Sequence, residues 1–143
     1  MSPAALGGVV DRCSAFFEQV GPPDLDEKPP GPCTKELLGV VVEEQVVGLV
    51  DLLRGYPTPD VGFIGLLALD PAVRGRGLGR QAEALILKRL DVAKVRLAVN
   101  FINPRGKAFW ESCGYRVIAE RPLRAAEDPT PTCWLMQKRV RWF

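Results

Sequence analysis

The 143-residue sequence contains no histidine. Because histidine titrates near neutral pH and is the most frequent metal ligand, its absence removes the commonest general base and the commonest metal-binding side chain together. The formal net charge is only +2, too small to indicate a nucleic-acid or membrane-surface partner. No apolar run is long enough to span a bilayer. We therefore expect no metal ion, no nucleic acid and no membrane among the ligands and partners of this chain.

The cysteines are few and widely spread, without any C-x-x-C pair. This spacing favours reduced thiols over a disulfide framework, although one disulfide pair remains the alternative. The N-terminal segment MSPAALGGVVDRC has no basic stretch followed by a sustained apolar one, which predicts that no signal peptide is present. We expect a cytoplasmic protein with a single domain over residues 1–143. The four thiols are those of Cys13, Cys33, Cys113 and Cys133.

The hydrophobic pattern predicts a mixture of strands and helices. A short helix is expected over Val9–Val20, and the Pro- and Gly-rich stretch over 21–33 is expected to be a loop. Two Val- and Leu-rich runs around Glu43–Gln45 predict a β-hairpin, and the apolar run from Val61 predicts a strand buried on both faces. The remaining expected elements are a helix from Leu78, a strand over 95–100, a helix from Asn103 to a stop at Gly114, and strands over 116–121 and 132–140. This order predicts a mixed sheet with helices packed on it.

The most informative stretch is RGRGLGR, Arg74–Arg80, which lies between the buried strand and the helix from Leu78. A helix start offers unpaired N–H groups and a partial positive charge. Glycines admit positive φ angles and a close approach of a ligand to the backbone, and arginines pair well with phosphate oxygens. Together these features predict an anion cradle, most naturally for a diphosphate.

Other phosphate loops fit this stretch less well. It lacks the G-x-x-x-x-G-K-[ST] pattern of a P-loop, and its G-x-G-x-G spacing differs from the dinucleotide fingerprint G-x-G-x-x-G. A simple helix cap is a further alternative, but three glycines and three arginines in seven residues exceed what a cap needs.

The same residues resemble the signature [QR]-x-x-G-x-[GA] of the GNAT superfamily of acetyl-CoA-dependent N-acetyltransferases. The resemblance extends over FIGLLALDPAVRGRGLGRQAEALIL and over the later block VNFINPRGKAFWESCGYRVI. It implies an α/β (α+β) fold with a mostly antiparallel central sheet, in which two parallel strands splay apart to admit the pantetheine arm of the co-substrate. The implied contacts with acetyl-CoA are the backbone of Leu67, Ala68 and Leu69, the turn formed by Arg74, Gly75, Arg76, Gly77, Leu78, Gly79 and Arg80, and the side chains of Asn103, Phe109 and Trp110.

The sequence departs from this family at three places. Gly65 stands where many members have a glutamate, and Trp110 stands where many have a tyrosine that protonates the departing thiolate. The opening strand of the family is not recognisable in MSPAALGGVV, so the chain is expected to lack that strand or to supply it differently. A carboxylate on the neighbouring strand, Asp51, is our candidate general base, expected opposite Ile64 or Gly65. The alternation of its strand favours the alternative, in which Asp51 is a solvent-facing strand residue.

The resemblance implies direct transfer of an acetyl group from acetyl-CoA to a primary amine in a ternary complex. The acceptor is expected to be a small amine or an amino-acid-like molecule, since loop carboxylates at Asp24, Asp26, Glu27 and Asp60 favour a cation. An acyl-CoA sensor without turnover is the alternative, supported by Gly65 and Trp110, and a nucleotide-binding protein is a third. A homodimer is also expected, because a missing edge strand would leave sheet backbone unpaired.

Overall fold

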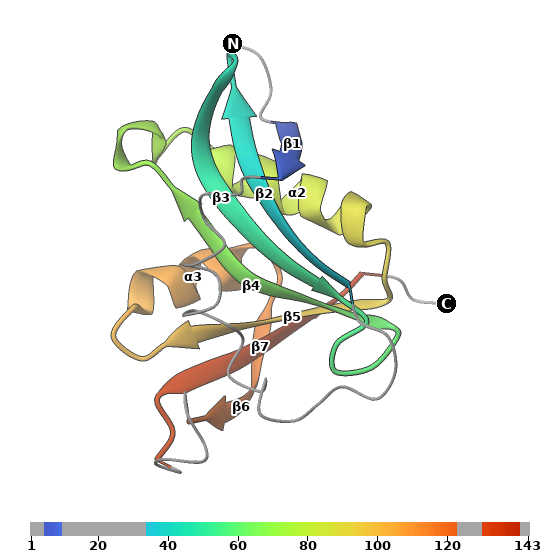
Figure 1. The fold of residues 1–143 in the computed structure, drawn as a ribbon. Helices are drawn as coiled ribbons and strands as arrows, with labels where there is room; N and C mark the ends of the chain where they lie inside the picture. The colour runs from blue at the N-terminus through green and yellow to red at the C-terminus, as the bar shows by residue number, and fades with distance from the viewer. Residues whose placement is uncertain (1–4, 10–33, 123–129, 141–143) are drawn as a thin grey trace.

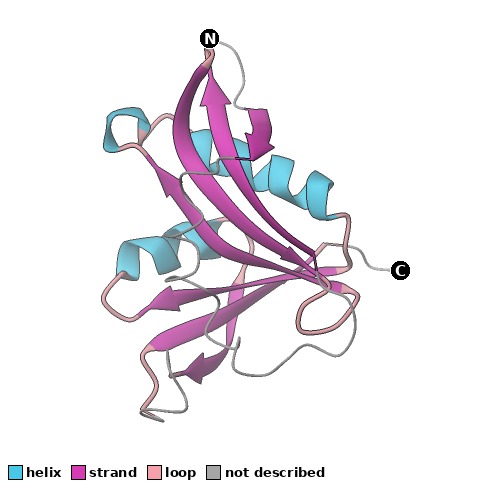
Figure 2. Cartoon of the chain, in the orientation of Figure 1, coloured by secondary structure: helices cyan, strands magenta, loops and turns pink. Residues whose placement is uncertain are grey.

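The computed structural model describes residues 5–9, 34–122 and 130–140, which form a seven-stranded sheet flanked by helices (Figure 1, Figure 2). The strand order is β1-β2-β3-β4-β5-β7-β6, and every neighbouring pair is antiparallel except β4–β5, which is parallel. The strands are β1 (Ala5–Val9), β2 (Thr34–Val42), β3 (Gln45–Arg54), β4 (Val61–Leu69), β5 (Lys94–Asn100), β6 (Arg116–Arg121) and β7 (Cys133–Arg139). The helices are α2 (Leu78–Leu90) and α3 (Pro104–Ser112), and a short 3₁₀ turn, η2 (Pro71–Val73), precedes α2. The predicted mixed, mostly antiparallel sheet is confirmed.

The predicted hairpin is formed by β2 and β3, which pair from Thr34–Arg54 to Val42–Gln45. The two residues that connect the strands, Glu43 and Glu44, have positive φ angles of 51° and 66°. Two consecutive left-handed residues match the right-handed twist of the flanking strands, which is why such turns usually carry Asn and Gly. Here two glutamates adopt this conformation instead.

The edge strand that the sequence did not reveal is present as β1. It pairs antiparallel with β2, from Ala5–Val41 to Val9–Leu38, so the expectation of a missing first strand is wrong for the described residues. Its sequence, ALGGV, has two glycines and little strand propensity, and its conformation is set by pairing with β2 rather than by local preference. Val9 therefore ends a strand rather than beginning the expected helix, and the rest of that helix lies outside the described residues.

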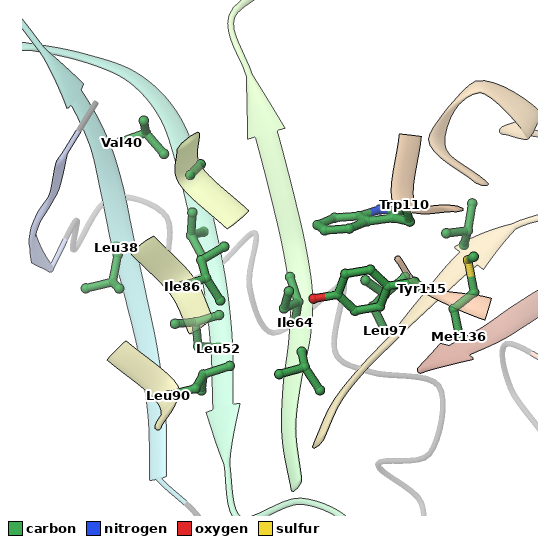
Figure 3. Close-up of a cluster of buried hydrophobic side chains, with 14 of the residues drawn as sticks. Leu38, Val40, Leu52, Ile64, Ile86, Leu90, Leu97, Trp110, Tyr115 and Met136 are labelled. Atoms are coloured by element: carbon green, nitrogen blue, oxygen red, sulfur yellow. The ribbon is translucent and has the colours of Figure 1, made fainter. Parts of the chain in front are cut away.

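The main core lies between the sheet and the two helices (Figure 3). Helix α2 buries Leu78, Ala82, Ile86 and Leu90, which recur every four residues and so line one face of the helix. Ile86 and Leu90 face Leu38 and Leu52 of the hairpin in Figure 3. A smaller cluster on the other face of the sheet contains Leu53, Tyr56, Phe63 and Leu135.

The end of α2 is tied to the hairpin by polar contacts. Arg54 Nε donates to the Leu90 carbonyl oxygen at 3.1 Å, and its guanidinium also contacts the Arg89 carbonyl. The last carbonyls of a helix lack partners within the helix, so the Arg54 guanidinium satisfies two of them. Arg89 in turn forms an ion pair of 2.5 Å with Glu36 of β2. Together these contacts fix the direction of α2 across the sheet.

Candidate active site

The parallel strands β4 and β5 separate halfway along their length. They pair only from Val61–Lys94 to Ile64–Leu97, and beyond Ile64 the register of β4 continues only with β3. The two strands diverge visibly from this point in Figure 1. The expectation that β4 is buried on both faces is therefore correct for Val61–Ile64 and wrong for its second half, which is only partly buried.

Gly65 is the residue at which the separation begins. Asp51 pairs with Leu66 and Leu52 pairs with Ile64, so Gly65 is an extra residue in the β3–β4 ladder. Such a bulge bends a strand and increases its twist. The bulge therefore turns the second half of β4 away from β5 and opens the gap that the family resemblance implied.

The backbone of β4 presents alternate residues to the gap. The Asp70 N–H donates to the Val47 carbonyl at 2.7 Å, so Asp70 faces β3. The backbone N–H and C=O groups point to opposite sides of a strand at successive residues. Those of Ala68 therefore also point to β3, whereas those of Leu67 and Leu69 point away from it. Of the three predicted main-chain contacts, Leu67 and Leu69 thus have the required direction and Ala68 does not.

A pocket of about 140 Å³ occupies the gap. Its walls are residues 64–67 of β4 on one side, residues 97–100 of β5 on the other, and two residues associated with α3. Those two are Asn103 and Trp110, both predicted contacts of the co-substrate. The space that the resemblance assigned to the pantetheine arm is therefore open in this chain.

The Gly/Arg turn has the geometry expected of an anion cradle. Gly75 and Gly77 have φ angles of +78° and +77°, and a Cβ atom at either would meet nothing within 4 Å. Gly77 caps α2, and the first bond of this helix runs from Gln81 N–H to the Gly77 carbonyl. The amides of residues 78–80 precede that bond and point outward at the helix start. The Leu78 side chain is buried, so only its amide is available to a ligand.

Two of the predicted cradle residues also contact other parts of the protein. Arg74 Nε donates to the Leu69 carbonyl at 3.1 Å, so this side chain reaches the mouth of the gap. Gly79 lies inside α2, and a Cβ atom there would be 2.9 Å from the Phe109 ring. The third glycine therefore permits close packing of α3 on α2, a reason that sequence spacing alone did not indicate. Arg76 and Arg80 are exposed beside the turn.

The start of α3 brings Asn103 to the pocket. Its Oδ1 accepts a hydrogen bond from Gly106 N–H at 3.0 Å, which makes Asn103 the N-cap of the helix. The amide oxygen is thus engaged in the cap, while the residue still lines the pocket. Phe109 does not line the pocket; it packs against Trp110 with ring centroids 4.9 Å apart and so lies behind the pocket wall.

Asp51 is buried at the bulge, with only 1% of its surface exposed. A Cβ atom at Gly65 would be 2.7 Å from Asp51 Oδ2, so the carboxylate occupies the space that a side chain at Gly65 would need. The alternative of a solvent-facing Asp51 is wrong, because its side of the sheet is covered. The expected register was also one residue off, since Asp51 pairs with Leu66.

The environment of Asp51 favours its protonated form at acidic and neutral pH. Burial raises the pKa of Asp51 from 3.8 to about 7, and the charge of Lys35 opposes this shift. Neither carboxylate oxygen has a hydrogen-bond partner among the residues that the structure describes. An unsatisfied carboxylate with a pKa near neutrality is suited to accept a proton from a ligand.

A buried charged group that sequence reasoning missed lies on α2. Glu83, 6% exposed, accepts a hydrogen bond from the Tyr115 hydroxyl at 3.2 Å and forms an ion pair with Lys138 at 3.3 Å. Its position three residues before Ile86, on the apolar face of the helix, was the signal available in the sequence. The preference for Tyr115 as a core aromatic over an acid agrees with the structure, since burial raises the pKa of this phenol far above neutrality.

The described residues contain two of the four cysteines. Cys113 and Cys133 are free thiols, and burial raises the pKa of Cys113; Cys13 and Cys33 lie outside the described residues. Within the described ranges, no cluster of three or more Cys, Asp or Glu side chains is arranged to hold a metal ion. The described helices include none with the length and hydropathy needed to cross a membrane.

Comparisons with known proteins bear on this geometry. The family model described as "Acetyltransferase (GNAT) family" matches residues 11–115. An uncharacterized protein of Mycobacterium leprae (strain TN) is 29% identical over 124 residues, which cover 79% of this chain and 33% of the relative. The chain thus spans about a third of the length of the curated relative that it matches.

Solved structures of acetyltransferases share the fold. An acetyltransferase from Thermus thermophilus superposes with a TM-score of 0.71 at 23% identity, covering 97% of this chain and 98% of its own. A Bacillus subtilis acetyltransferase in complex with CoA has a TM-score of 0.65 at 13% identity, covering 97% and 99%. A GNAT family acetyltransferase from Elizabethkingia anophelis with acetyl-CoA bound has a TM-score of 0.66 at 12% identity, covering 98% and 100%. Because the family model matches residues 11–115, which are most of the chain, the chain belongs to the acetyltransferase (GNAT) family.

Proposed function

We propose that this protein transfers the acetyl group of acetyl-CoA to the primary amine of a small molecule, by direct attack of the amine in a ternary complex. The single observation that carries the proposal is the separation of β4 from β5 after Ile64, which leaves an open pocket beside strand backbone that no longer pairs with β5. Membership of the acetyltransferase family supports the reaction class. The acceptor and the direct mechanism are the proposed part.

The residues present fit acetyl-CoA. The Leu67 backbone and the Leu69 N–H would pair with the polar groups of the pantetheine arm, while the Leu69 carbonyl accepts from Arg74. The outward amides of residues 78–80 and the exposed Arg76 and Arg80 would hold the diphosphate, because a helix start and guanidinium groups both favour phosphate oxygens. The space open around Gly75 and Gly77 would let this ligand lie directly on the turn.

Asp51 is the proposed general base. Acetyl-CoA supplies an activated thioester, so the chain has mainly to position the amine, remove its proton and stabilise the developing oxyanion. Asp51 lies behind Gly65, which lines the pocket, and its buried oxygens, which have no hydrogen-bond partner among the described residues, would take the proton of the amine through a water molecule in the pocket. Its pKa of about 7 makes it a proton acceptor above neutral pH. Backbone N–H groups of β4 that face the gap would stabilise the oxyanion.

The acceptor is proposed to be a small amine or an amino-acid-like molecule. Asp51 does not line the pocket itself, so the acceptor nitrogen has to enter the narrow pocket beside Gly65, which favours a slender group such as a terminal amine. Asp60 lies exposed in the loop between β3 and β4 and would favour a cationic acceptor; Asp24, Asp26 and Glu27 lie outside the described residues. The protein is proposed to act in the cytoplasm, where the free thiols of Cys113 and Cys133 stay reduced.

The experiment that tests the function is a thiol-release assay. The purified protein is incubated with acetyl-CoA and a panel of polyamines, amino acids and aminoglycosides, and free CoA thiol is measured against time. Release that depends on one acceptor class, with an N-acetylated product of the matching mass, supports the proposal. Release that is independent of every acceptor would mean thioester hydrolysis and would contradict it.

An acyl-CoA sensor without turnover is the second candidate. Gly65 and Trp110 favour it, because the chain lacks the glutamate and tyrosine that many family members have at these positions. Indole N–H does not act as a proton acid, so Trp110 cannot supply the proton that tyrosine would. Binding of CoA measured by calorimetry, combined with no product for any amine, would establish the sensor and displace the enzyme.

A further inference from the structure

Glu83 is a buried carboxylate that the proposed chemistry does not use. It projects from α2, and it is satisfied from two other elements: Tyr115 donates to Oε2 at 3.2 Å, and Lys138 of β7 lies 3.3 Å from Oε1. Keeping a charged group at 6% exposure costs free energy unless it is paired and hydrogen-bonded. Both conditions are met here, so the position of Tyr115 relative to α2 is closely defined.

The Tyr115 ring in turn holds Trp110. The two rings are 5.2 Å apart with an interplanar angle of 74°, an edge-to-face contact. In Figure 3 the Tyr115 ring lies directly below the Trp110 indole. Trp110 also contacts Phe109, with ring centroids 4.9 Å apart, and Phe109 lies against Gly79.

Helix α2 therefore contacts this row of rings at two points. Gly79 contacts Phe109, and Glu83 contacts Tyr115. Residues four apart lie on the same face of a helix, so the two contacts are one turn apart, and the ring at each contact also touches Trp110. The helix whose first amides form the cradle thus also sets the position of the pocket wall.

Trp110 forms part of the wall of a pocket of only about 140 Å³. This space has to receive the thioester end of the arm together with its acyl group. A displacement of the indole changes the room for the acyl chain directly, because the opposite walls are strand residues fixed by the sheet.

We propose that Glu83 is a positioning residue which, through Tyr115, holds Trp110 against the pocket and thereby restricts the transferred acyl group to acetyl. The inference rests on the proposed acyl transfer and adds its acyl selectivity. It predicts that loosening the contact between Glu83 and Tyr115 admits longer acyl groups without any change at the pocket itself.

The test measures selectivity rather than activity. For the wild type and for Glu83→Gln and Tyr115→Phe, kcat/KM is determined with acetyl-CoA and with butyryl-CoA, using the same amine. The ratio of the two values is unaffected by partial unfolding, because both donors encounter the same fraction of folded protein. The wild type is expected to prefer acetyl-CoA by at least roughly tenfold. In either variant this preference is expected to fall by roughly three- to tenfold.

Matched variants separate this role from simple stabilisation. Glu111→Gln removes the carboxylate of the α3 surface ion pair with Lys107 and should leave the ratio unchanged. The double variant Glu83→Gln/Tyr115→Phe should shift the ratio no further than the larger single effect, because both changes break one link. If Glu83→Gln does not fold because Lys138 is left unpaired, the double variant Glu83→Gln/Lys138→Met, which removes both charges, is measured in its place.

A preference for acetyl-CoA that stays at the wild-type value in both Glu83→Gln and Tyr115→Phe, while their melting temperatures fall, overturns the proposal. Failure of the proposed function has a different signature, since the wild type would then release thiol from neither donor. In that case the proposal is tested by the ratio of the Kd values for the two thioesters, measured by calorimetry. This ratio is expected to shift in Glu83→Gln and Tyr115→Phe, and a ratio that stays at the wild-type value in both variants overturns the proposal.

Discussion

The side chain of Asp51 and the missing side chain of Gly65 fit together, and neither residue shows this when it is considered alone. The carboxylate of one fills the space left by the missing side chain of the other, at a distance of 2.7 Å from where a Cβ would lie. A glutamate on β4 and an aspartate on β3 can thus reach the same region from neighbouring strands. The absence of a glutamate at Gly65 is therefore compatible with base catalysis from Asp51.

Replacing this carboxylate should change how activity depends on pH. In the wild type, kcat/KM is expected to rise through pH 7 as Asp51 ionises, in addition to the rise caused by deprotonation of the amine. Asp51→Asn should lose the inflection near pH 7 and reduce kcat/KM by roughly 10²- to 10⁴-fold at pH 8. Initial rates between pH 5.5 and 9 measure this. An Asn variant that retains the inflection would exclude Asp51 as the base.

The same residue should make stability depend on pH. The pKa of Asp51 is raised in the folded state, so the protonated form favours folding and the advantage is lost as pH rises through about 7. Relative to the wild type, Asp51→Asn should gain stability between pH 5 and 9, by up to roughly 3 kcal/mol. Urea denaturation at the two pH values measures the change.

Asp60→Asn is the matched control for that measurement. The hydrogen bond from Thr58 lowers the pKa of Asp60, which is exposed, so ionised Asp60 favours folding at high pH. The Asn variant at this position should therefore gain nothing at pH 9. A gain as large as that of Asp51→Asn would attribute the effect to net charge instead of burial.

Among the elements, the hairpin between β2 and β3 was predictable and its turn was not. Alternating Val and Leu runs indicate the two strands, but a Glu-Glu pair gives no sign of two consecutive left-handed residues. The twist of the paired strands imposes this conformation on the turn. Likewise, α2 was evident from its apolar period, whereas β1 exists through its pairing with β2.

The strained turn should be improvable. Glu43→Asn/Glu44→Gly places at the turn the residues that tolerate positive φ, and it should raise the free energy of unfolding by about 1–2 kcal/mol. Urea denaturation measures the gain, and the KM for acetyl-CoA should not change because neither glutamate lines the pocket. Glu43→Gln/Glu44→Gln removes the same charges while retaining Cβ atoms, and an equal gain there would refute the backbone explanation.

The assembled sheet and helices create a site that should couple ligand binding to global stability. CoA at about 100 times its Kd should raise the free energy of unfolding by about 2.7 kcal/mol. Gly77→Ala should weaken this effect, because a Cβ strains a residue with φ of +77° and covers the helix start. Thermal unfolding with CoA and with ATP at equal concentrations measures it. A larger shift with ATP would favour a nucleotide-binding protein over an acetyltransferase.

The homodimer stays a prediction, and the edge of the sheet that supports it is now β6 instead of the first strand. The expected vacancy at the first strand is occupied by β1, so that edge of the sheet no longer supplies the argument. At the opposite edge, β6 exposes 38% of Val117 and 38% of Ile118. Light scattering in solution measures the oligomeric state.

The sequence by itself determined the order of the elements from β2 to β7, the helix start after a Gly-rich turn and the family, because hydrophobic period and glycine spacing act over a few neighbouring residues. Only the tertiary structure decided which side chains meet. The bulge at Gly65 shifts a register by one residue, places Asp51 in the space beside it and opens the gap. The contact of Glu83 with Tyr115 joins residues 32 positions apart. Such contacts depend on how strands and helices that are far apart in the sequence pack together, and local sequence patterns do not indicate that packing.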